Sequence, residues 1–169
     1  MLTCSQIETA VANHFGYCQN IIVPNVSWGL FHNGQEVDVL VVRPSGYAIE
    51  VEIKISASDI KADLKKRHAH NNNLIKMTYF AVPSKLAENT DIPVRFGVLS
   101  IDDNDDAHFL KTVRAATANK SAKKLSPEQI LKVYALASMR IWSLKKSLIS
   151  SQNQIRHWRD LAKSAGKTS

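Results

Sequence analysis

The fold is set by two neighbouring runs of sequence, EVDVLVVR (Glu36–Arg43) and YAIEVEIKI (Tyr47–Ile55). Pro44-Ser45-Gly46 separates them. Both runs are rich in β-branched residues, and the three residues between them are typical of a tight turn. Two such runs joined by a short turn predict an antiparallel hairpin. Side chains alternate across a strand, so one face of this hairpin is expected to be apolar, with Val37, Val39, Ile49, Val51, Ile53 and Ile55.

The other face of the predicted hairpin is charged and carries Glu36, Asp38, Glu50, Glu52 and Lys54. Like charges that oppose each other destabilise a sheet, so four clustered carboxylates require compensation. A hard divalent cation such as Mg²⁺ or Mn²⁺ provides it, because carboxylate oxygens without His or Cys suit these ions. The alternative is that Glu and Lys alternate on the solvated outer face of an antiparallel sheet.

A divalent cation beside Lys54 would suit phosphodiester hydrolysis. The metal lowers the pKa of a bound water, and Lys54 would orient that water or stabilise the developing negative charge. Four basic residues that follow are expected to contact nucleic-acid phosphates: Lys61, Lys65, Lys66 and Arg67. For Lys61 and Lys65, one helical turn apart, a solvated face is the alternative.

Elements on both sides of the hairpin complete a mixed α/β pattern. A capping box at Ser5–Glu8 and a closing Gly16 predict a helix over 5–15. Ser56 or Ser58 is expected to cap a second helix, and Ser126-Pro127 begins a third. The Ser150-Ser151 region is expected to interrupt this third helix. Strands are predicted over 20–28 at a sheet edge, 75–82 and 94–101, with 108–113 pairing back; the second helix is predicted over 59–68.

Charge divides the 169-residue chain into two parts. Residues 1–110 carry 9 Lys/Arg and 13 Asp/Glu (net −4), whereas residues 111–169 carry 13 and 2 (net +11), which together give +7. We therefore expect a domain over 1–113, then a basic connector and C-terminal helical extension over 114–169, with a polyanion as partner. The extension is expected either to clamp DNA or to pair through its apolar stripe, which runs from Ile130 to Leu148, with a second copy or a partner helix.

Several cellular contexts are excluded by the sequence pattern. The longest apolar run is five residues, Val133–Ala137, so no membrane-spanning segment is expected. The start of the chain lacks a secretory-signal pattern, and Cys4 and Cys18 match neither a metal site nor a disulfide framework. These features predict a cytoplasmic protein.

The order Glu8, Asp38 and Glu52-Ile53-Lys54 resembles the PD-(D/E)XK nuclease superfamily, and the resemblance covers residues 5–101. Three strings make it more specific, because they are similar to MmcB-like DNA-repair endonucleases and to small phage proteins: Glu52–Ser56, Ser58–Asp63 and Tyr79–Pro83. The resemblance implies a restriction-endonuclease-like core of a helix, a three-strand meander, a second helix and further strands in a mixed sheet.

The resemblance also implies roles for individual residues in a metal-dependent DNA endonuclease of repair, recombination or phage DNA processing. Asp38, Glu52 and the main-chain carbonyl of Ile53 would hold the metal, and Lys54 would be the catalytic lysine. Glu8 would support the site, although its place in the capping box offers another role. Val37 stands where the family often has Pro, and Glu36 and Glu50 are rival ligands. A non-catalytic DNA-binding module on the same fold is the alternative function.

Overall fold

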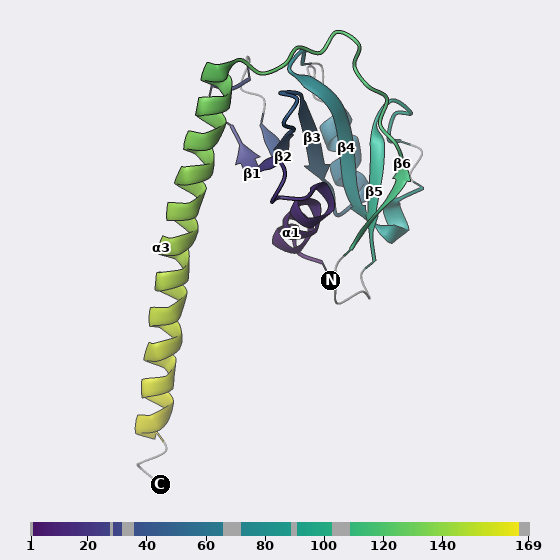
Figure 1. Cartoon of the computed structure of the whole chain (residues 1–169). Coiled ribbons are helices and arrows are strands. Elements are labelled where there is room, and N and C mark those ends of the chain that lie inside the picture. Colours follow the sequence, from purple (N-terminus) through teal and green to yellow (C-terminus); the bar gives the residue numbers. More distant parts are fainter. Residues whose placement is uncertain are drawn as a thin grey trace. The chain divides into compact units, whose positions relative to one another are not determined.

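A computed structural model describes residues 2–27, 29–31, 36–65, 72–88, 91–102 and 109–165 (Figure 1). The chain forms two compact units that divide after Val133. The boundary placed after residue 113 thus lies inside the first unit. The reason is that the basic connector is hydrogen-bonded to the sheet domain, for example from the Leu125 N–H to the Gly46 carbonyl (2.9 Å).

The first unit is built on one six-stranded mixed sheet in the order β1-β2-β3-β4-β5-β6. The strands are β1 (Ile21–Val26), β2 (Val37–Val42), β3 (Ala48–Ile53), β4 (Ile75–Pro83), β5 (Gly97–Ile101) and β6 (Leu110–Arg114). Strands β1, β2 and β3 are successively antiparallel, β3, β4 and β5 are parallel, and β6 returns antiparallel to β5. The predicted hairpin, the edge position of β1 and the pairing of the last strand are confirmed.

The capping box of helix α1 (Cys4–Phe15) lies two residues earlier than predicted. Thr3 is the N-cap: its main-chain N–H donates to Gln6 Oε1 (2.8 Å), and its hydroxyl accepts from the Gln6 N–H (3.3 Å). Two overlapping sequence frames fit the capping-box pattern, and the chain uses the first one. Gly16 closes the helix in the left-handed conformation, as predicted (φ 71°).

Helix α2 (Ala57–Leu64) connects the parallel strands β3 and β4. Ser56 caps it by accepting a hydrogen bond from the Asp59 N–H (3.1 Å). It ends at Leu64, earlier than the sequence pattern predicted, and the rest of the expected helix falls outside the described residues. After β4 the chain makes one short 3₁₀ turn, η2 (Ser84–Leu86).

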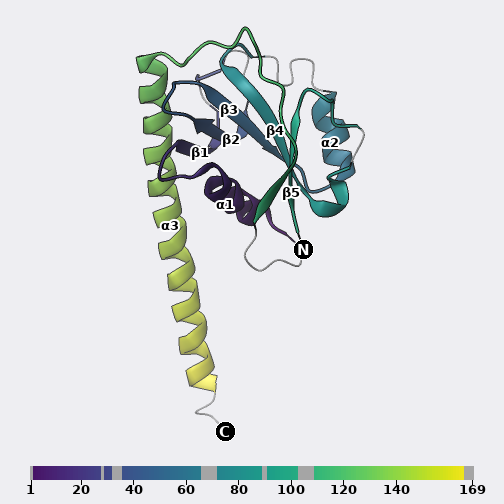
Figure 2. The same ribbon diagram turned by 45° about the vertical axis from the view of Figure 1, so that its right-hand side comes forward.

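The two helices cover opposite faces of the sheet, as the two views in Figures 1 and 2 show. The α1 side holds the apolar face predicted from the hairpin, including Val39, Ile49 and Val51. On the other side, Ile60 of α2 packs in a second apolar cluster with Phe80 of β4. The charged face of the hairpin is therefore an interior face, and its interpretation as a solvated outer surface is wrong.

The C-terminal helix α3 (Pro127–Ala165) runs without a break past Ser150-Ser151, where the sequence suggested an interruption. Serine costs a helix interior only a few tenths of a kcal/mol relative to alanine, so two of them do not end a long helix. The predicted cap is confirmed, since Ser126 accepts from the Gln129 N–H (3.3 Å) and donates its own N–H to Gln129 Oε1 (2.8 Å). No described helix is long and apolar enough to span a membrane.

Gly97 on β5 provides a direct test of the sheet packing. It pairs with Tyr79 of β4, and a Cβ at position 97 would overlap the Tyr79 ring. We expect Gly97→Ala to lower the free energy of unfolding by about 2 kcal/mol, the usual cost of overpacking a core. Urea unfolding measures this, and Tyr79→Ala in the same chain should recover part of the loss. An unchanged stability in Gly97→Ala would contradict the described packing.

Candidate active site

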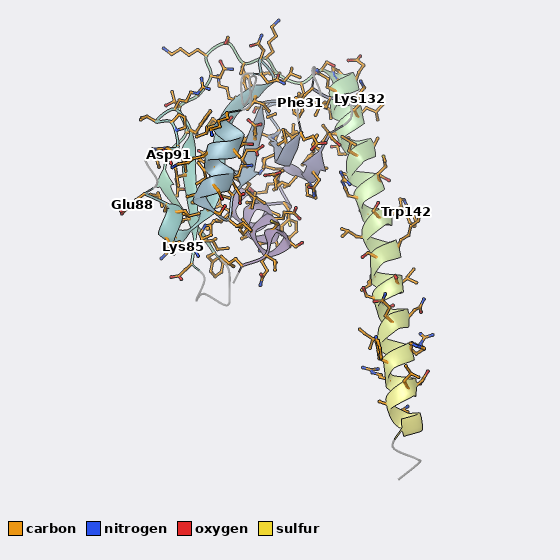
Figure 3. All side chains as sticks on the ribbon, turned by 180° about the vertical axis from the view of Figure 1, so that it is seen from behind. Phe31, Lys85, Glu88, Asp91, Lys132 and Trp142 are labelled. Carbon is orange, nitrogen blue, oxygen red and sulfur yellow. The ribbon has the colours of Figure 1, made fainter. Side chains whose placement is uncertain are left out.

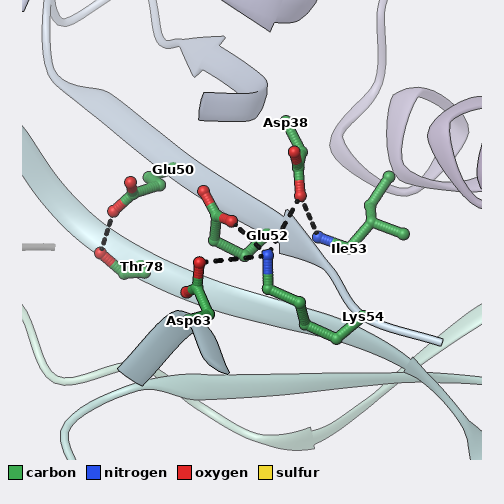
Figure 4. Close-up of polar contacts among 7 residues, drawn as sticks. All are labelled: Asp38, Glu50, Glu52, Ile53, Lys54, Asp63 and Thr78. Atoms are coloured by element: carbon green, nitrogen blue, oxygen red, sulfur yellow. Dashed lines mark hydrogen bonds and ion pairs between the residues drawn. The ribbon is translucent and has the colours of Figure 1, made fainter. Parts of the chain in front are cut away.

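The β2–β3 hairpin brings Asp38 and Glu52 together. Leu40 pairs with Glu50 and Val39 with Val51, so the same register places Asp38 next to Glu52. The Ile53 N–H donates to Asp38 Oδ2 (2.8 Å), so the aspartate side chain bonds the main chain of the neighbouring strand (Figure 4). The Asp38 side chain is 40% exposed, which makes it the solvent-facing member of the site.

Lys54 lies at the centre of the site. Its Nζ donates to Glu52 Oε2 (2.7 Å) and lies 3.5 Å from both Asp38 Oδ2 and Asp63 Oδ1. The Lys54 main-chain N–H donates to the Ala81 carbonyl of β4 (3.1 Å), which fixes the lysine just beyond the end of β3. One buried ammonium thus contacts carboxylates from β2, β3 and α2 (Figure 4).

Asp63 is the member of the site that sequence reasoning missed. Asp59 and Asp63 are one helical turn apart, and this spacing alone favours ion pairing within the helix or a contact with the helix dipole. In the structure α2 buries Ile60 and Asp63, three residues apart and therefore on one helix face. An acidic residue on the apolar side of an amphipathic helix was the available signal.

Glu50 is fully buried on the same face of the sheet, two residues before Glu52 on β3. It pairs across the sheet with Thr78, whose hydroxyl donates to Glu50 Oε2 (2.9 Å). Glu36, the other rival ligand, is exposed ahead of β2. We call the group Asp38, Glu50, Glu52, Lys54 and Asp63 the charged cluster; it holds four carboxylates and one ammonium.

Burial shifts the pKa values within the charged cluster. Desolvation and, next, the negative charge of Asp38 raise the pKa of Glu52 to about 7, although Lys54 acts in the opposite direction. For Lys54, desolvation alone would lower the pKa. The charge and hydrogen bond of Glu52, with the charges of Asp38 and Asp63, outweigh it and hold the pKa of Lys54 well above its ordinary value. Lys54 is therefore an ammonium ion at neutral pH.

In the part of the chain that the structure describes, Glu8 contacts the strand next to Asp38 and not the residues of the charged cluster themselves. Glu8 lies on α1 and accepts a hydrogen bond from Asn25 Nδ2 of β1 (3.2 Å). Among the described residues, no hydrogen bond or ion pair joins Glu8 to Asp38, Glu52 or Lys54. The predicted role of Glu8 in the capping box is wrong, because Thr3 and Gln6 form that box.

The predicted nucleic-acid contacts on α2 lie on an exposed surface. Lys61 forms an ion pair with Asp91 (3.6 Å), and Lys65 is the C-terminal cap of the helix. Figure 3 labels Asp91, together with Lys85 and Glu88, on this side of the first unit. Lys66 and Arg67 lie outside the described residues.

The charged cluster offers only oxygen donors to a metal ion. Asp38 and Glu52 are adjacent and the Ile53 carbonyl lies between Glu52 and Lys54 in sequence, which is the donor set that the resemblance implies. Within the described part of the chain, no three Asp, Glu, His or Cys side chains are arranged as a ready metal site. The implied set does not require three, because it uses two carboxylates and a carbonyl. Hard oxygen donors of this kind fit Mg²⁺ or Mn²⁺.

Comparison with known proteins places the fold but not the activity. No family model matches the chain, and no curated protein matches it. Among solved structures, the chain is similar to a protein of unknown function from Silicibacter pomeroyi, with a TM-score of 0.59 and 20% sequence identity. The match covers 88% of this chain and 92% of that chain, and it concerns the fold alone.

The raised pKa of Glu52 predicts a pH-dependent stability. Between pH 4.5, the ordinary pKa, and pH 7, the folded protein retains a proton that the unfolded chain has lost. The free energy of unfolding should therefore fall as the pH rises through this window, by up to about 3 kcal/mol. Lys54 does not contribute here, since its stabilisation is lost only above its ordinary pKa of 10.5.

Glu52→Gln should remove this decline, because glutamine does not titrate and still offers an oxygen to Lys54. Denaturant unfolding at both ends of the window, in buffer with a metal chelator, measures the difference between the two proteins. Parallel pH profiles for the wild type and the variant would show that Glu52 is not perturbed.

Proposed function

We propose that the protein is a metal-dependent endonuclease that hydrolyses phosphodiester bonds in DNA, in repair, recombination or phage DNA processing. The observation that carries this proposal is the charged cluster, in which Asp38, Glu52 and Lys54 meet at the end of one hairpin. The element order α1-β1-β2-β3-α2-β4, with β3 and β4 parallel, supports it. This element order agrees with the restriction-endonuclease-like core that the sequence resemblance implies.

The energetic cost of the charged cluster favours a functional role. Removing charged groups from water costs several kcal/mol per ion, and a buried ion pair often adds no net stability over an apolar replacement. Apolar side chains such as Phe80 and Ile60 fill the rest of this face. Four carboxylates around one ammonium are therefore a poor solution for stability, whereas perturbed ionisable groups are characteristic of active sites.

A divalent metal fits this site by charge as well as by donor type. The cluster has three more carboxylates than ammonium groups, and Asp38 is open to solvent. Asp38, Glu52 and the Ile53 carbonyl would hold Mg²⁺ or Mn²⁺. When bound, the metal would activate water for attack on phosphorus and polarise the phosphoryl group.

Lys54 provides a fixed positive charge next to the expected metal ligands. Because it remains protonated, it donates hydrogen bonds and does not accept a proton from water. It can orient the attacking water and stabilise negative charge on the phosphoryl oxygens. The Lys54–Ala81 main-chain bond and the contact with Asp63 hold the ammonium in place, so little reorganisation is needed during the reaction.

A cleavage assay tests this proposal. Plasmid, single-stranded and four-way-junction DNA are incubated with Mg²⁺ or Mn²⁺, and Asp38→Asn is compared with the wild type. We expect the wild type to cut at least one substrate and Asp38→Asn to lose about 100-fold or more. Lys85→Ala, which removes a positive charge outside the charged cluster, should cut normally.

Lys54→Gln should also abolish cutting, but it leaves buried carboxylates without their ammonium and can cost about 3–5 kcal/mol of stability. Asp38→Asn is the more informative variant, because its side chain is partly exposed and retains an acceptor for the Ile53 N–H. Equal cutting by the wild type and Asp38→Asn would place the activity elsewhere. DNA binding without cutting under all conditions would favour the non-catalytic DNA-binding module.

The partner of α3 in this proposal is a second copy of the chain. Beyond Val133, positions spaced alternately by three and four residues are apolar except Ser151, which is the pattern of a coiled-coil seam. They are Tyr134, Ala137, Ile141, Leu144, Leu148, Ser151, Ile155, Trp158 and Ala162. Six of these positions carry large apolar side chains that are exposed: Tyr134, Ile141, Leu144, Leu148, Ile155 and Trp158.

The seam is self-complementary when two copies run antiparallel about Lys146. Ala137 would then face Ile155 and Ser151 would face Ile141, so that small residues oppose large ones in these pairs, and Leu144 would face Leu148 next to the centre. The seam is flanked by Arg140, Lys145 and Arg159 and by no acidic residue, so two copies repel each other at low salt.

We therefore expect a dimer that becomes tighter as the salt concentration rises, measured by sedimentation of the full chain. Leu144→Glu should dissociate it, because a charge enters the seam. Met139→Glu, which adds the same charge at an exposed position outside the seam, should not. A monomer at every salt concentration, or an association that weakens as the salt concentration rises, would contradict the pairing.

A further inference from the structure

A segment of the basic connector, Thr117–Leu125, is fixed across the sheet at the ends where the parallel strands begin (Figure 1). We call this segment the strap. Its main-chain N–H groups donate to carbonyls that lie just before or at the start of β3, β4 and β5. The pairs are Thr117–Arg95 (2.9 Å), Asn119–Lys76 (2.8 Å), Lys123–Asn73 (2.7 Å) and Leu125–Gly46 (2.9 Å).

Positive charge gathers at this end of the sheet. The strap and the chain segments under it contribute Arg43, Lys76, Lys120, Lys123 and Lys124. No Asp or Glu occurs in the sequence segments 39–49, 72–79 and 115–127 that build this surface. Neighbouring acidic residues in these segments therefore do not neutralise the lysines, in contrast to Lys61 on α2 with its partner Asp91.

Two of these lysines are held in place. The Nζ atoms of Lys76 and Lys124 lie 5.0 and 5.6 Å from the centroid of the Tyr47 ring. Lys76 Nζ also donates to the Asn119 carbonyl of the strap (3.0 Å). The Lys124 side chain packs on Gly46, where a Cβ would stand 3.4 Å from the Lys124 Cβ. Two ammonium groups near one aromatic ring repel each other, and an anion bound beside them would reduce this repulsion.

We propose that the strap, with Tyr47, Lys76 and Lys124, binds the phosphate backbone of DNA at the end of the sheet opposite the charged cluster. The inference deepens the proposed nuclease function and rests on it for the identity of the polyanion. Ala48 and Lys54 are six residues apart along β3, which corresponds to about 20 Å. This distance equals about six nucleotide steps at about 3.4 Å per step along one strand.

DNA binding by the full chain, without divalent metal and with a chelator, tests the strap separately from cleavage. The probe is a fluorescently labelled DNA duplex of two helical turns, followed by anisotropy over a series of salt concentrations. Lys123→Ala/Lys124→Ala removes two exposed strap side chains and retains the main-chain hydrogen bonds. Lys85→Ala/Lys111→Ala removes two lysines outside the strap as the matched control.

We expect the strap variant to lose about tenfold in affinity at low salt. Its plot of log affinity against log salt should flatten by about 1.8, because each phosphate contact contributes a slope of about 0.9. The control variant should bind within about twofold of the wild type. Circular dichroism and thermal unfolding confirm that both variants are folded. Equal binding by the strap variant and the wild type, or equal losses in both variants, would overturn the proposal.

Poly-glutamate added at the same charge concentration is the competing polyanion. Displacement of the labelled duplex by poly-glutamate at a lower charge concentration than unlabelled duplex requires would assign the strap to acidic polypeptides and also overturn the proposal. The readouts separate the two proposals. Strap-dependent binding with no cleavage by metal-loaded protein would leave the strap assignment standing and remove the nuclease. Cleavage together with DNA binding that does not depend on the strap would support the nuclease and remove the strap assignment.

Discussion

The contact of the Lys54 ammonium with three carboxylates is the interaction on which the interior of this sheet depends. Lys54 joins Asp38 of β2, Glu52 of β3 and Asp63 of α2, while its own main chain is bonded to β4. It is therefore a centre where three strands and the crossover helix meet. Removing the ammonium would leave the buried carboxylates of Glu52 and Asp63 without their counterion, which is strongly destabilising.

This arrangement separates the two ends of the parallel strands. At the carboxyl ends lies a cluster with excess negative charge, suited to a divalent cation. At the amino ends lies the strap, where Lys76 and Lys124 lie near the Tyr47 ring. The segments that form this surface contain no acidic residue. A nucleic acid carries negative charge along its whole length, so it needs positive groups at both places: the lysines at one end, and metal with Lys54 at the other. In the proposed function, the opposite signs of the two ends would serve one polyanionic substrate.

The hairpin and its two faces could be predicted from sequence, because strict alternation in Ile49–Ile55 leaves one possible assignment of inward and outward side chains. Asp38, Glu52 and Lys54 could be grouped for the same reason. Whether their face was buried could not be predicted from the hairpin, since burial depends on the α2 crossover between β3 and β4. Asp63 was missed for this reason: its role arises only when α2 packs on the sheet. The Thr3 cap differs from the prediction because two overlapping capping frames have nearly equal energies. Helix α3 is uninterrupted because serine is only slightly less favourable than alanine inside a helix. The role of the connector depended on long-range main-chain hydrogen bonds, which leave no pattern in the sequence.

If the charged cluster is a divalent-metal site, the protein binds such a metal with no substrate present. Calorimetric titration of the purified chain with Mn²⁺ should show saturable binding that Asp38→Asn removes or weakens at least tenfold. The control Lys85→Ala should bind like the wild type. Saturable binding that is unchanged in Asp38→Asn would place the metal elsewhere. Absence of binding to the folded wild-type protein would contradict the account and leave the charged cluster as a structural feature.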